Sequence, residues 1–238
     1  MMGPPFAVAK PASIPDTCQT ALLARRPGLG HGARDVGSRV PLWCLIAFAV
    51  VWIGLGIAPR YREDWLLENL PTLVGVPAAI VGYRRFRFSD RAYLQATLFL
   101  LLHTVGSHYT YSEVPAGFWA RDLFGWTRNH YDRFVHFAFG VLMLRPVREL
   151  GFRHGHPGLG AELVLSVAVV ALCSVLYELL EWAVASVVDP AAGTAFLGTQ
   201  GDQWDAQQDM ALALAGATLA AAVEWWLDRR SYAGTTMR

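Results

Sequence analysis

Charged residues are scarce in this sequence. Of its 238 residues, 16% are Asp, Glu, Lys or Arg, whereas 54% are hydrophobic, and the mean hydropathy is +0.31. Soluble globular domains usually contain about 25% charged and about 45–50% apolar residues. The balance therefore argues against a soluble globular protein. Because so apolar a chain must bury its surface somewhere, it also argues against disorder over most of the length.

Cysteine is also rare, and several familiar motifs are missing. The three cysteines, Cys18, Cys44 and Cys173, are far apart and match no metal or redox spacing, so a disulfide scaffold or zinc finger is not expected. The sequence holds no P-loop, nucleophile elbow or dinucleotide fingerprint, so we expect no nucleotide or flavin cofactor. The basic clusters are explained by membrane topology and anionic lipid headgroups. Membrane lipids are therefore the expected partners, and nucleic acid is not.

Long apolar stretches are what the sequence has in abundance. A bilayer core of roughly 30 Å requires about 20 helical residues. The second stretch, residues 65–82, is interrupted by Pro71 and Pro77, and the fourth, residues 131–147, has an uninterrupted apolar core over only Phe137 to Leu144. Both are therefore predicted to be kinked or locally hydrated. We expect an all-α polytopic membrane protein, a bundle of about six transmembrane helices. The six stretches cover residues 41–57, 65–82, 92–108, 131–147, 161–188 and 205–227.

The distribution of basic residues predicts the orientation, because short loops rich in Lys and Arg stay cytoplasmic. Fifteen basic residues lie in the two tails and the loops after the second and fourth stretches, against four in the alternate loops, with Arg133 inside a span. The loop after the fourth stretch is expected to hold Arg145, Arg148 and Arg153. We therefore expect a multi-pass protein of the bacterial inner (cytoplasmic) membrane with both termini in the cytoplasm.

Composition divides the chain into three regions. Residues 1–40, rich in Pro, Gly and Arg, are predicted to form a flexible cytoplasmic tail. Residues 41–228 are predicted to form the six-span membrane domain, and residues 229–238 a second cytoplasmic tail. The outer loop 109–130 is rich in aromatic residues, with Pro115 and Gly117 ahead of a short amphipathic run. This pattern is typical of an interfacial helix lying on the membrane.

Ionisable residues inside spans are costly and are therefore functional candidates. Asp132 and His136 are four residues apart on one helical face, and Glu178 and Glu181 are three apart. An acidic stripe, Asp202, Asp205 and Asp209, introduces the sixth stretch. The predicted topology places all these groups in the outer half of the membrane, at the depth of Glu68, His103 and His108, while the inner halves, such as 139–144, 163–172 and 211–223, contain no charge.

Several desolvated carboxylates must be protonated, solvated or bound to a cation. Carboxylates with one or two histidines suit Zn, Mn, Fe or Mg, and such a metal could activate water or hold a phosphate. The chemistry expected of an enzyme here is hydrolysis or transfer at a lipid-linked headgroup, with metal-bound water as the nucleophile and a carboxylate as the base. The candidate metal ligands are His136, Glu181, Asp205 and Asp209, and the candidate catalytic residues are Asp132, Arg133, Glu178 and Asp202.

Structural interpretations compete with these roles. Glu178 and Glu181 could form a structural hydrogen-bonded pair, Asp202 could be a plain helix N-cap, and Asp132 with Arg133 an interfacial ion pair. Two other functions also remain open. A proton- or cation-coupled transporter would use the same carboxylates but predicts polar groups continuing to the cytoplasmic side. A structural or assembly subunit would use the buried polar network only to specify packing.

Three motifs carry a family resemblance: Tyr131-Asp132-Arg133-x-x-His136-Phe137, Glu178-x-x-Glu181-Trp182 and Gly198-Thr199-Gln200-Gly201-Asp202-x-x-Asp205-Ala206-x-x-Asp209. In this order they resemble the YjdF-like inner membrane proteins, a bacterial family without an established activity, over roughly residues 41–228. The acid-and-histidine motifs are more distantly similar to those of VanZ-like membrane proteins. The resemblance implies a membrane location and the span count, and no reaction. Glu178-x-x-Glu181 also lacks the Glu-x-x-His pattern of di-iron bundles.

Overall fold

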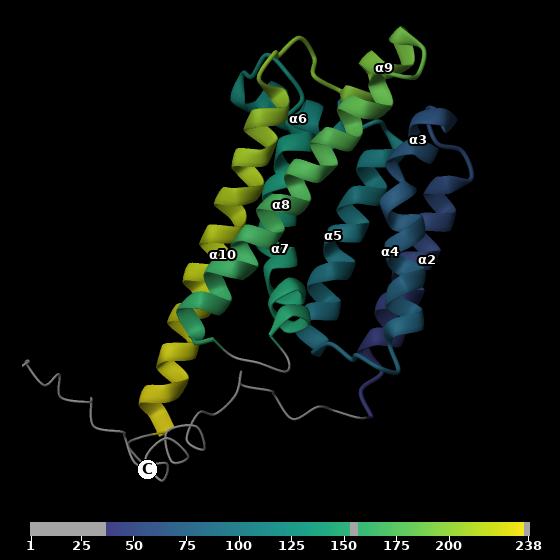
Figure 1. Ribbon diagram of the computed structural model, residues 1–238. Helices are drawn as coiled ribbons and strands as arrows, with labels where there is room; N and C mark the ends of the chain where they lie inside the picture. Colours follow the sequence, from purple (N-terminus) through teal and green to yellow (C-terminus); the bar gives the residue numbers. More distant parts are fainter. Residues whose placement is uncertain (1–36, 153–156, 236–238) are drawn as a thin grey trace, which may run out of the picture. The chain divides into compact units, whose positions relative to one another are not determined.

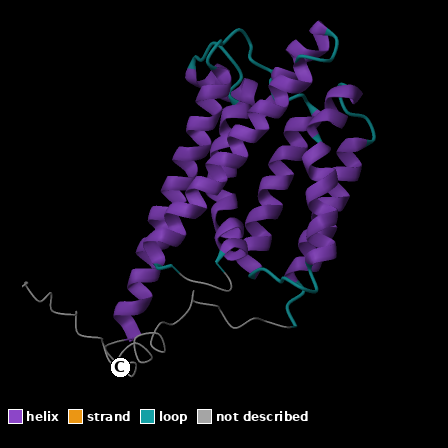
Figure 2. Cartoon of the chain, in the orientation of Figure 1, coloured by secondary structure: helices purple, strands orange, loops and turns teal. Residues whose placement is uncertain are grey.

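The computed structural model describes residues 37–152 and 157–235, and within them all regular secondary structure is helical (Figure 2). The predicted tail residues 1–36 and 236–238 lie outside the described residues. The all-α fold expected from hydropathy is confirmed. In chain order the helices are α2 (Val40–Gly56), α3 (Arg62–Glu68), α4 (Leu70–Gly82), α5 (Asp90–His108), α6 (Pro115–Phe124), α7 (Tyr131–Gly151), α8 (Leu159–Ala185), α9 (Pro190–Leu197) and α10 (Asp205–Thr235) (Figure 1).

Six helical segments correspond to the six predicted spans: α2, the α3–α4 pair, α5, α7, α8 and α10. By length and apolar composition, α8 and the Asp205–Arg230 part of α10 could each cross a membrane, and the bent α3–α4 pair makes a third if it is one span. Large apolar side chains such as Val50, Val74 and Val164 are exposed on the helix surfaces. Helices with self-satisfied backbones and apolar outer surfaces suit a bilayer. The chain is thus a polytopic helical membrane protein.

The second span is bent where α3 gives way to α4. The two helices meet at an angle of 44°, which confirms the kink expected from the prolines. Asn69, at the junction, is fully buried. Its side chain accepts a hydrogen bond from Trp52 Nε1 at 2.6 Å and donates to the Trp65 carbonyl at 2.8 Å and to Ser107 Oγ at 3.2 Å. Pro71 lies in the first turn of α4, where its missing N–H costs nothing.

The closest helix packing joins α7 to α10. A Cβ atom at Gly140 would overlap the carbonyl oxygen of Ala213, and one at Gly216 would overlap the carbonyl oxygen of Phe137. Small residues at such positions let two helix backbones approach within van der Waals distance. Further along the same interface, Leu144, Val170 and Ala217 form a fully buried core between α7, α8 and α10. This packing determines which faces of α7 and α10 meet.

The loop 109–130 contains the predicted interfacial helix as α6, whose outward residues Trp119, Leu123 and Phe124 are 73%, 77% and 63% exposed. Gly125 ends the helix in the left-handed conformation, with φ of 67°. The loop 189–204 holds a short helix, α9, that hydropathy did not predict. We refer to the end of the helices where α3, α6 and α9 lie as the α6 end (Figure 1).

At the opposite end, the expectation that Arg145 and Arg148 lie in a loop is wrong. Both lie inside α7, which continues to Gly151, and Arg148 is 3% exposed. Its guanidinium contacts Glu224 at 2.7 Å, Asp228 at 2.9 Å and Glu162 at 3.3 Å. Three carboxylates from α8 and α10 thus compensate the buried cation, so the last turns of α7 remain helical and packed.

Candidate functional site

Two residues of α7 and one of α10 form a compact group of possible metal ligands. Asp132, His136 and Asp209 each offer one ligand atom, and these atoms all lie within 4.8 Å of one another. Asp132 and His136 are one turn apart near the start of α7, with His136 Nε2 3.6 Å from Asp132 Oδ1. Asp209 lies one turn into α10. The close contact of the two helices at Gly140 and Gly216 brings these faces together.

A fourth group comes from α8. Glu178 Oε1 lies 3.3 Å from His136 Nε2, and its side chain is 8% exposed. Neither Glu178 Oε1 nor Asp209 Oδ1 has a hydrogen-bond partner among the described residues. Buried carboxylate oxygens without partners are costly, so this arrangement is suited to a cation. The donor set of carboxylates and one imidazole fits Zn, Mn, Fe or Mg.

Glu181 lies beside this group rather than within the compact set of three. It interacts electrostatically with Glu178, Glu68, Asp132 and Asp209 and is partly buried. Two tyrosines lie in the same region. Tyr177 donates a hydrogen bond to Glu68 Oε2 at 2.7 Å, and the hydroxyl of Tyr111 lies 2.5 Å from His103 Nδ1. The carboxylates of the second, fourth, fifth and sixth predicted spans therefore share one polar region.

Asp202 and Asp205 face two arginines instead of the metal-ligand group. Arg128 Nη1 donates to Asp205 Oδ1 at 2.6 Å, and Arg133 Nη2 lies 2.5 Å from Asp202 Oδ2 and 3.2 Å from Asp205 Oδ1. Asp205 is 3% exposed, and its pairing with both cations compensates its burial.

Asp202 has a further role in the turn before α10. Its Oδ1 accepts the backbone N–H of Trp204 at 2.9 Å, and its Oδ2 accepts a hydrogen bond from Gln208. The hydrogen bond from Trp204 and the one from Arg133 lower the pKa of the Asp202 carboxyl. Burial lowers the pKa of nearby His130, and the positive charge of Arg133 lowers it further. Asp202 is therefore ionised whenever this turn is intact at neutral pH.

The arginine pair also offers unused donors. Arg128 is 9% exposed, and its Nε and Nη2 have no hydrogen-bond partner among the described residues; the same holds for Nε of Arg133. The Nε–Nη2 edge of a guanidinium carries two parallel N–H groups that match an oxyanion in a bidentate arrangement. The site thus combines unpartnered acceptors beside His136 with unpartnered donors on Arg128 and Arg133.

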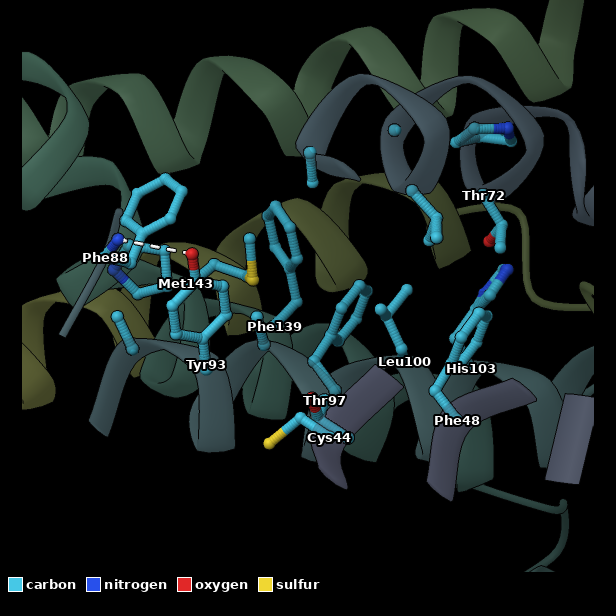
Figure 3. Close-up of a pocket in the computed structure, with 18 of the residues that line it drawn as sticks. Cys44, Phe48, Thr72, Phe88, Tyr93, Thr97, Leu100, His103, Phe139 and Met143 are labelled. Atoms are coloured by element: carbon cyan, nitrogen blue, oxygen red, sulfur yellow. Dashed lines mark hydrogen bonds between the residues drawn. The ribbon is translucent and has the colours of Figure 1, made fainter. Parts of the chain in front are cut away.

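A large apolar cavity reaches this polar region. It has a volume of about 680 Å³ and is lined by α2, α4, α5, α7 and α8, together with Tyr83, Phe88 and Tyr111. Figure 3 shows His103, Phe48 and Thr72 at one end and Phe88, Tyr93 and Met143 at the other. Asp132 and His136 line it as well, so two of the three candidate ligands face the cavity.

Tyr177, Tyr111 and the charged cluster around Arg148 were not predicted from the sequence. Tyr177 precedes Glu178 in its motif, which is a signal that could have identified it. Tyr111 lies in an aromatic loop and gave no such signal, and its contact with His103 depends on a backbone with φ of 45° at Tyr111. The Arg148 cluster was not predicted because Arg148 was expected in a loop, whereas its partners Glu162, Glu224 and Asp228 are distant in the sequence.

Comparison with known proteins agrees with the membrane fold. Residues 40–230 match the family model described as "Predicted membrane protein (DUF2238)". The chain is 35% identical over 173 residues to the inner membrane protein YjdF of Escherichia coli (strain K12), a match that covers 72% of this chain and 82% of that protein. No solved structure matches the chain. The chain belongs to the DUF2238 family of membrane proteins, whose YjdF-like character its motifs indicated.

Proposed function

We propose that this protein binds a divalent cation at Asp132, His136 and Asp209 and uses it for hydrolysis or transfer at the headgroup of a membrane lipid. The observation that carries the proposal is the convergence of these three side chains beside the end of a large apolar cavity. A headgroup held there would place its reacting bond against the ligand group while its apolar part remained among the helices.

The balance of charge supports the cation. Asp202 and Asp205 already neutralise Arg128 and Arg133 through close ion pairs. Asp132, Asp209 and Glu178 instead gather around His136 and have no such close ion pair with an arginine among the described residues. Burying an uncompensated carboxylate is expensive, and a divalent cation is a compact way to offset several at once.

The unused guanidinium donors favour an anionic headgroup, and a phosphate ester fits them best. Arg128 presents its Nε–Nη2 edge, and Arg133 its Nε, without a partner among the described residues. Both arginines interact electrostatically with Asp132. A phosphate between them and the cation would satisfy the donors and counter the repulsion by Asp132 and Asp209.

The chemistry then follows from the positions of these groups. A bound divalent cation lowers the pKa of a coordinated water and makes it a nucleophile at neutral pH. In hydrolysis the water oxygen would form a bond to phosphorus as the bond to the leaving oxygen broke. Glu178, whose carboxylate lies 3.3 Å from His136, would take the proton from the water and return it to the leaving oxygen. In transfer, an acceptor hydroxyl replaces the water.

The location of this activity is part of the same proposal. The excess of basic residues in the two tails and in the loops after the second and fourth predicted spans supports a cytoplasmic position for both termini. The protein would then cross the inner membrane six times, with the α6 end and its site open to the outer leaflet.

The test is metal analysis of the purified full-length protein. We expect stoichiometric Zn, Mn or Fe, or saturable binding of added Mg²⁺, and its loss in Asp209→Asn. The matched control is Asp122→Asn, because Asp122 is 67% exposed on α6 and pairs with Arg121. A parent protein that holds no metal and binds none when it is added would overturn the proposal.

The buried Arg148 cluster is the observation that favours a cation- or proton-coupled transporter, because it places charge at both ends of the helices. Between the two charged regions, however, residues 139–144, 163–172 and 211–223 contain no ionisable side chain. A charge would have to cross this apolar layer, which is costly. Cation uptake or lipid flipping in liposomes that disappears in Glu178→Gln would favour transport over hydrolysis.

A further inference from the structure

The apolar cavity is long as well as large. Along α7 its lining runs from Asp132 to Pro146, and along α5 from Ala92 to His103. At a rise of about 1.5 Å per residue these spans correspond to about 21 Å and about 16 Å. One leaflet of a bilayer has a hydrocarbon thickness of about 15 Å, half of the core. The cavity therefore has the length of a single lipid chain.

The lining changes in character along this length. Asp132, His136 and His103 are the ionisable side chains near the α6 end, with the hydroxyls of Tyr111 and Tyr177 beside them. Away from them, the lining is formed mainly by aliphatic and aromatic side chains, among them Leu100, Phe139 and Met143 (Figure 3). A polar end followed by an apolar length matches an amphiphile with one chain.

The α4 wall of the cavity packs loosely. Among the described helices, its backbone makes a few close contacts with α3 and fewer with any other helix, α8 included. Gly75 and Ala79 on α4 and Cys173 on α8 line the cavity and are exposed, so it opens between these two helices. In a bilayer the medium outside this opening is lipid. A chain can therefore enter sideways without passing through water.

An empty cavity of this size is unfavourable. Side chains that face a void lose their dispersion contacts, and protein interiors leave few voids larger than a water molecule. The surrounding lipid chains are as apolar as the lining, so one of them can restore those contacts without a hydrophobic penalty.

We infer that the cavity between α2, α4, α5, α7 and α8 is a binding site for one hydrocarbon chain of a membrane lipid, with the lipid's headgroup at Asp132 and His136. The position of the headgroup rests on the proposed function, whereas chain binding rests on the cavity alone. The far end, at Tyr93 and Met143, limits the length of chain that fits.

The test is photolabelling in proteoliposomes with hexadecyl phosphate that carries a diazirine at the end of its chain. Mass spectrometry then maps the labelled residues of the full-length protein. We expect labelling of Tyr93 and Met143 to exceed that of Leu94 and Leu98, which face outward from α5 and are 55% and 49% exposed. Uniform labelling of lipid-facing residues, without enrichment at Tyr93 and Met143, would overturn the inference.

Adjacent alanines provide a matched pair of variants. Ala79 lines the cavity and Ala78 does not, although both are exposed residues of α4. Ala79→Trp should fill the cavity and reduce labelling at Met143 about tenfold, whereas Ala78→Trp should leave it within about twofold of the parent. Equal labelling in the two variants contradicts chain binding. If Ala79→Trp does not fold, Ala96→Phe, with Leu98→Phe as its control, makes the same comparison from α5.

The same measurement separates this inference from the proposed function. Labelling is repeated with Asp209→Asn and after removal of divalent cations with a chelator. Enrichment at Met143 that persists after metal removal supports chain binding independently of the metal. The same enrichment in a parent protein that binds no metal shows that the metal proposal alone has failed. Metal binding in a parent protein whose cavity is not labelled shows that the chain inference alone has failed.

Discussion

Gly140 of α7 lies so close to Ala213 of α10 that a Cβ atom added at Gly140 would overlap the carbonyl oxygen of Ala213. The contact lies one helical turn beyond His136 and one turn beyond Asp209. It therefore sets the distance between the two helices at the depth of the candidate metal ligands. The site depends on a glycine that carries no chemistry of its own.

Gly140→Ala should destabilise the protein by about 3 kcal/mol or more, because the neighbouring atoms are backbone and cannot rotate away. It should also weaken metal binding by moving Asp209 away from His136. Thermal unfolding in detergent measures the first effect. Gly54→Ala is the control: Gly54 has no atom within 4 Å of an added Cβ, and alanine is favoured in a helix by about 0.5–1 kcal/mol. Equal behaviour of the two variants would contradict the close contact.

Metal should stabilise the parent protein and leave His136→Ala unaffected. A ligand that binds only the folded state adds about 2.7 kcal/mol at one hundred times its dissociation constant. We expect the unfolding temperature of the parent to rise with added Zn²⁺ or Mn²⁺ and to fall back after chelation. Asp122→Asn should respond as the parent does. A rise of the same size in His136→Ala would show that the stabilising metal binds elsewhere.

Asp202 predicts a specific dependence of stability on pH. Hydrogen bonds from Trp204 and Arg133 lower its pKa in the folded protein, so the unfolded state binds a proton more readily. The stability contributed by ionised Asp202 is fully present above its unfolded pKa of about 3.9. It is lost as the pH falls through the lower pKa of the folded protein. Unfolding curves of the parent and Asp202→Asn should therefore differ by a constant amount above about pH 5 and converge below about pH 4. A difference that grows on acidification would refute this.

Arg148→Met should be strongly destabilising. The change removes a cation that pairs with the buried carboxylates of Glu162 and Glu224, and breaking one side of a buried ion pair costs about 3–5 kcal/mol. Arg84→Ala, which removes an exposed arginine from the connection between α4 and α5, should change stability by less than about 0.5 kcal/mol. Because Arg148 lies far from the ligand group along α7, a folded Arg148→Lys protein should retain metal binding.

Most of the fold could be read from hydropathy, because each transmembrane helix must satisfy its own backbone and needs about 20 apolar residues. The kink in the second span and the helix in the loop 109–130 were predicted, since proline and amphipathic aromatic patterns are local signals. The helix α9 was missed, as was the continuation of α7 beyond residue 147. There the helix is kept by ion pairs to Glu162, Glu224 and Asp228, residues that are distant in the sequence.

The candidate site was predicted in its residue types and only partly in its grouping. Asp202, Asp205 and Asp209 are equivalent in the sequence, one acidic stripe along a helical face. The structure separates them: Asp209 joins Asp132 and His136, whereas Asp205 pairs with Arg128 and Arg133. The stripe is too long for all three carboxylates to reach one set of partners. Its end at Asp209 therefore meets Asp132 and His136, and its other end meets the two arginines.

By itself, the scarcity of charge in this sequence determined that the protein lies in a membrane and that its few intramembrane acids are unusual. Hydropathy is a local property, and the bilayer acts on each segment separately. Only the tertiary structure decided which acids meet, that a cavity of about 680 Å³ ends beside them, and that Arg148 is buried. These features depend on how the helices rotate and approach one another. Contacts such as the one between Gly140 and Ala213, far apart in the chain, set that arrangement.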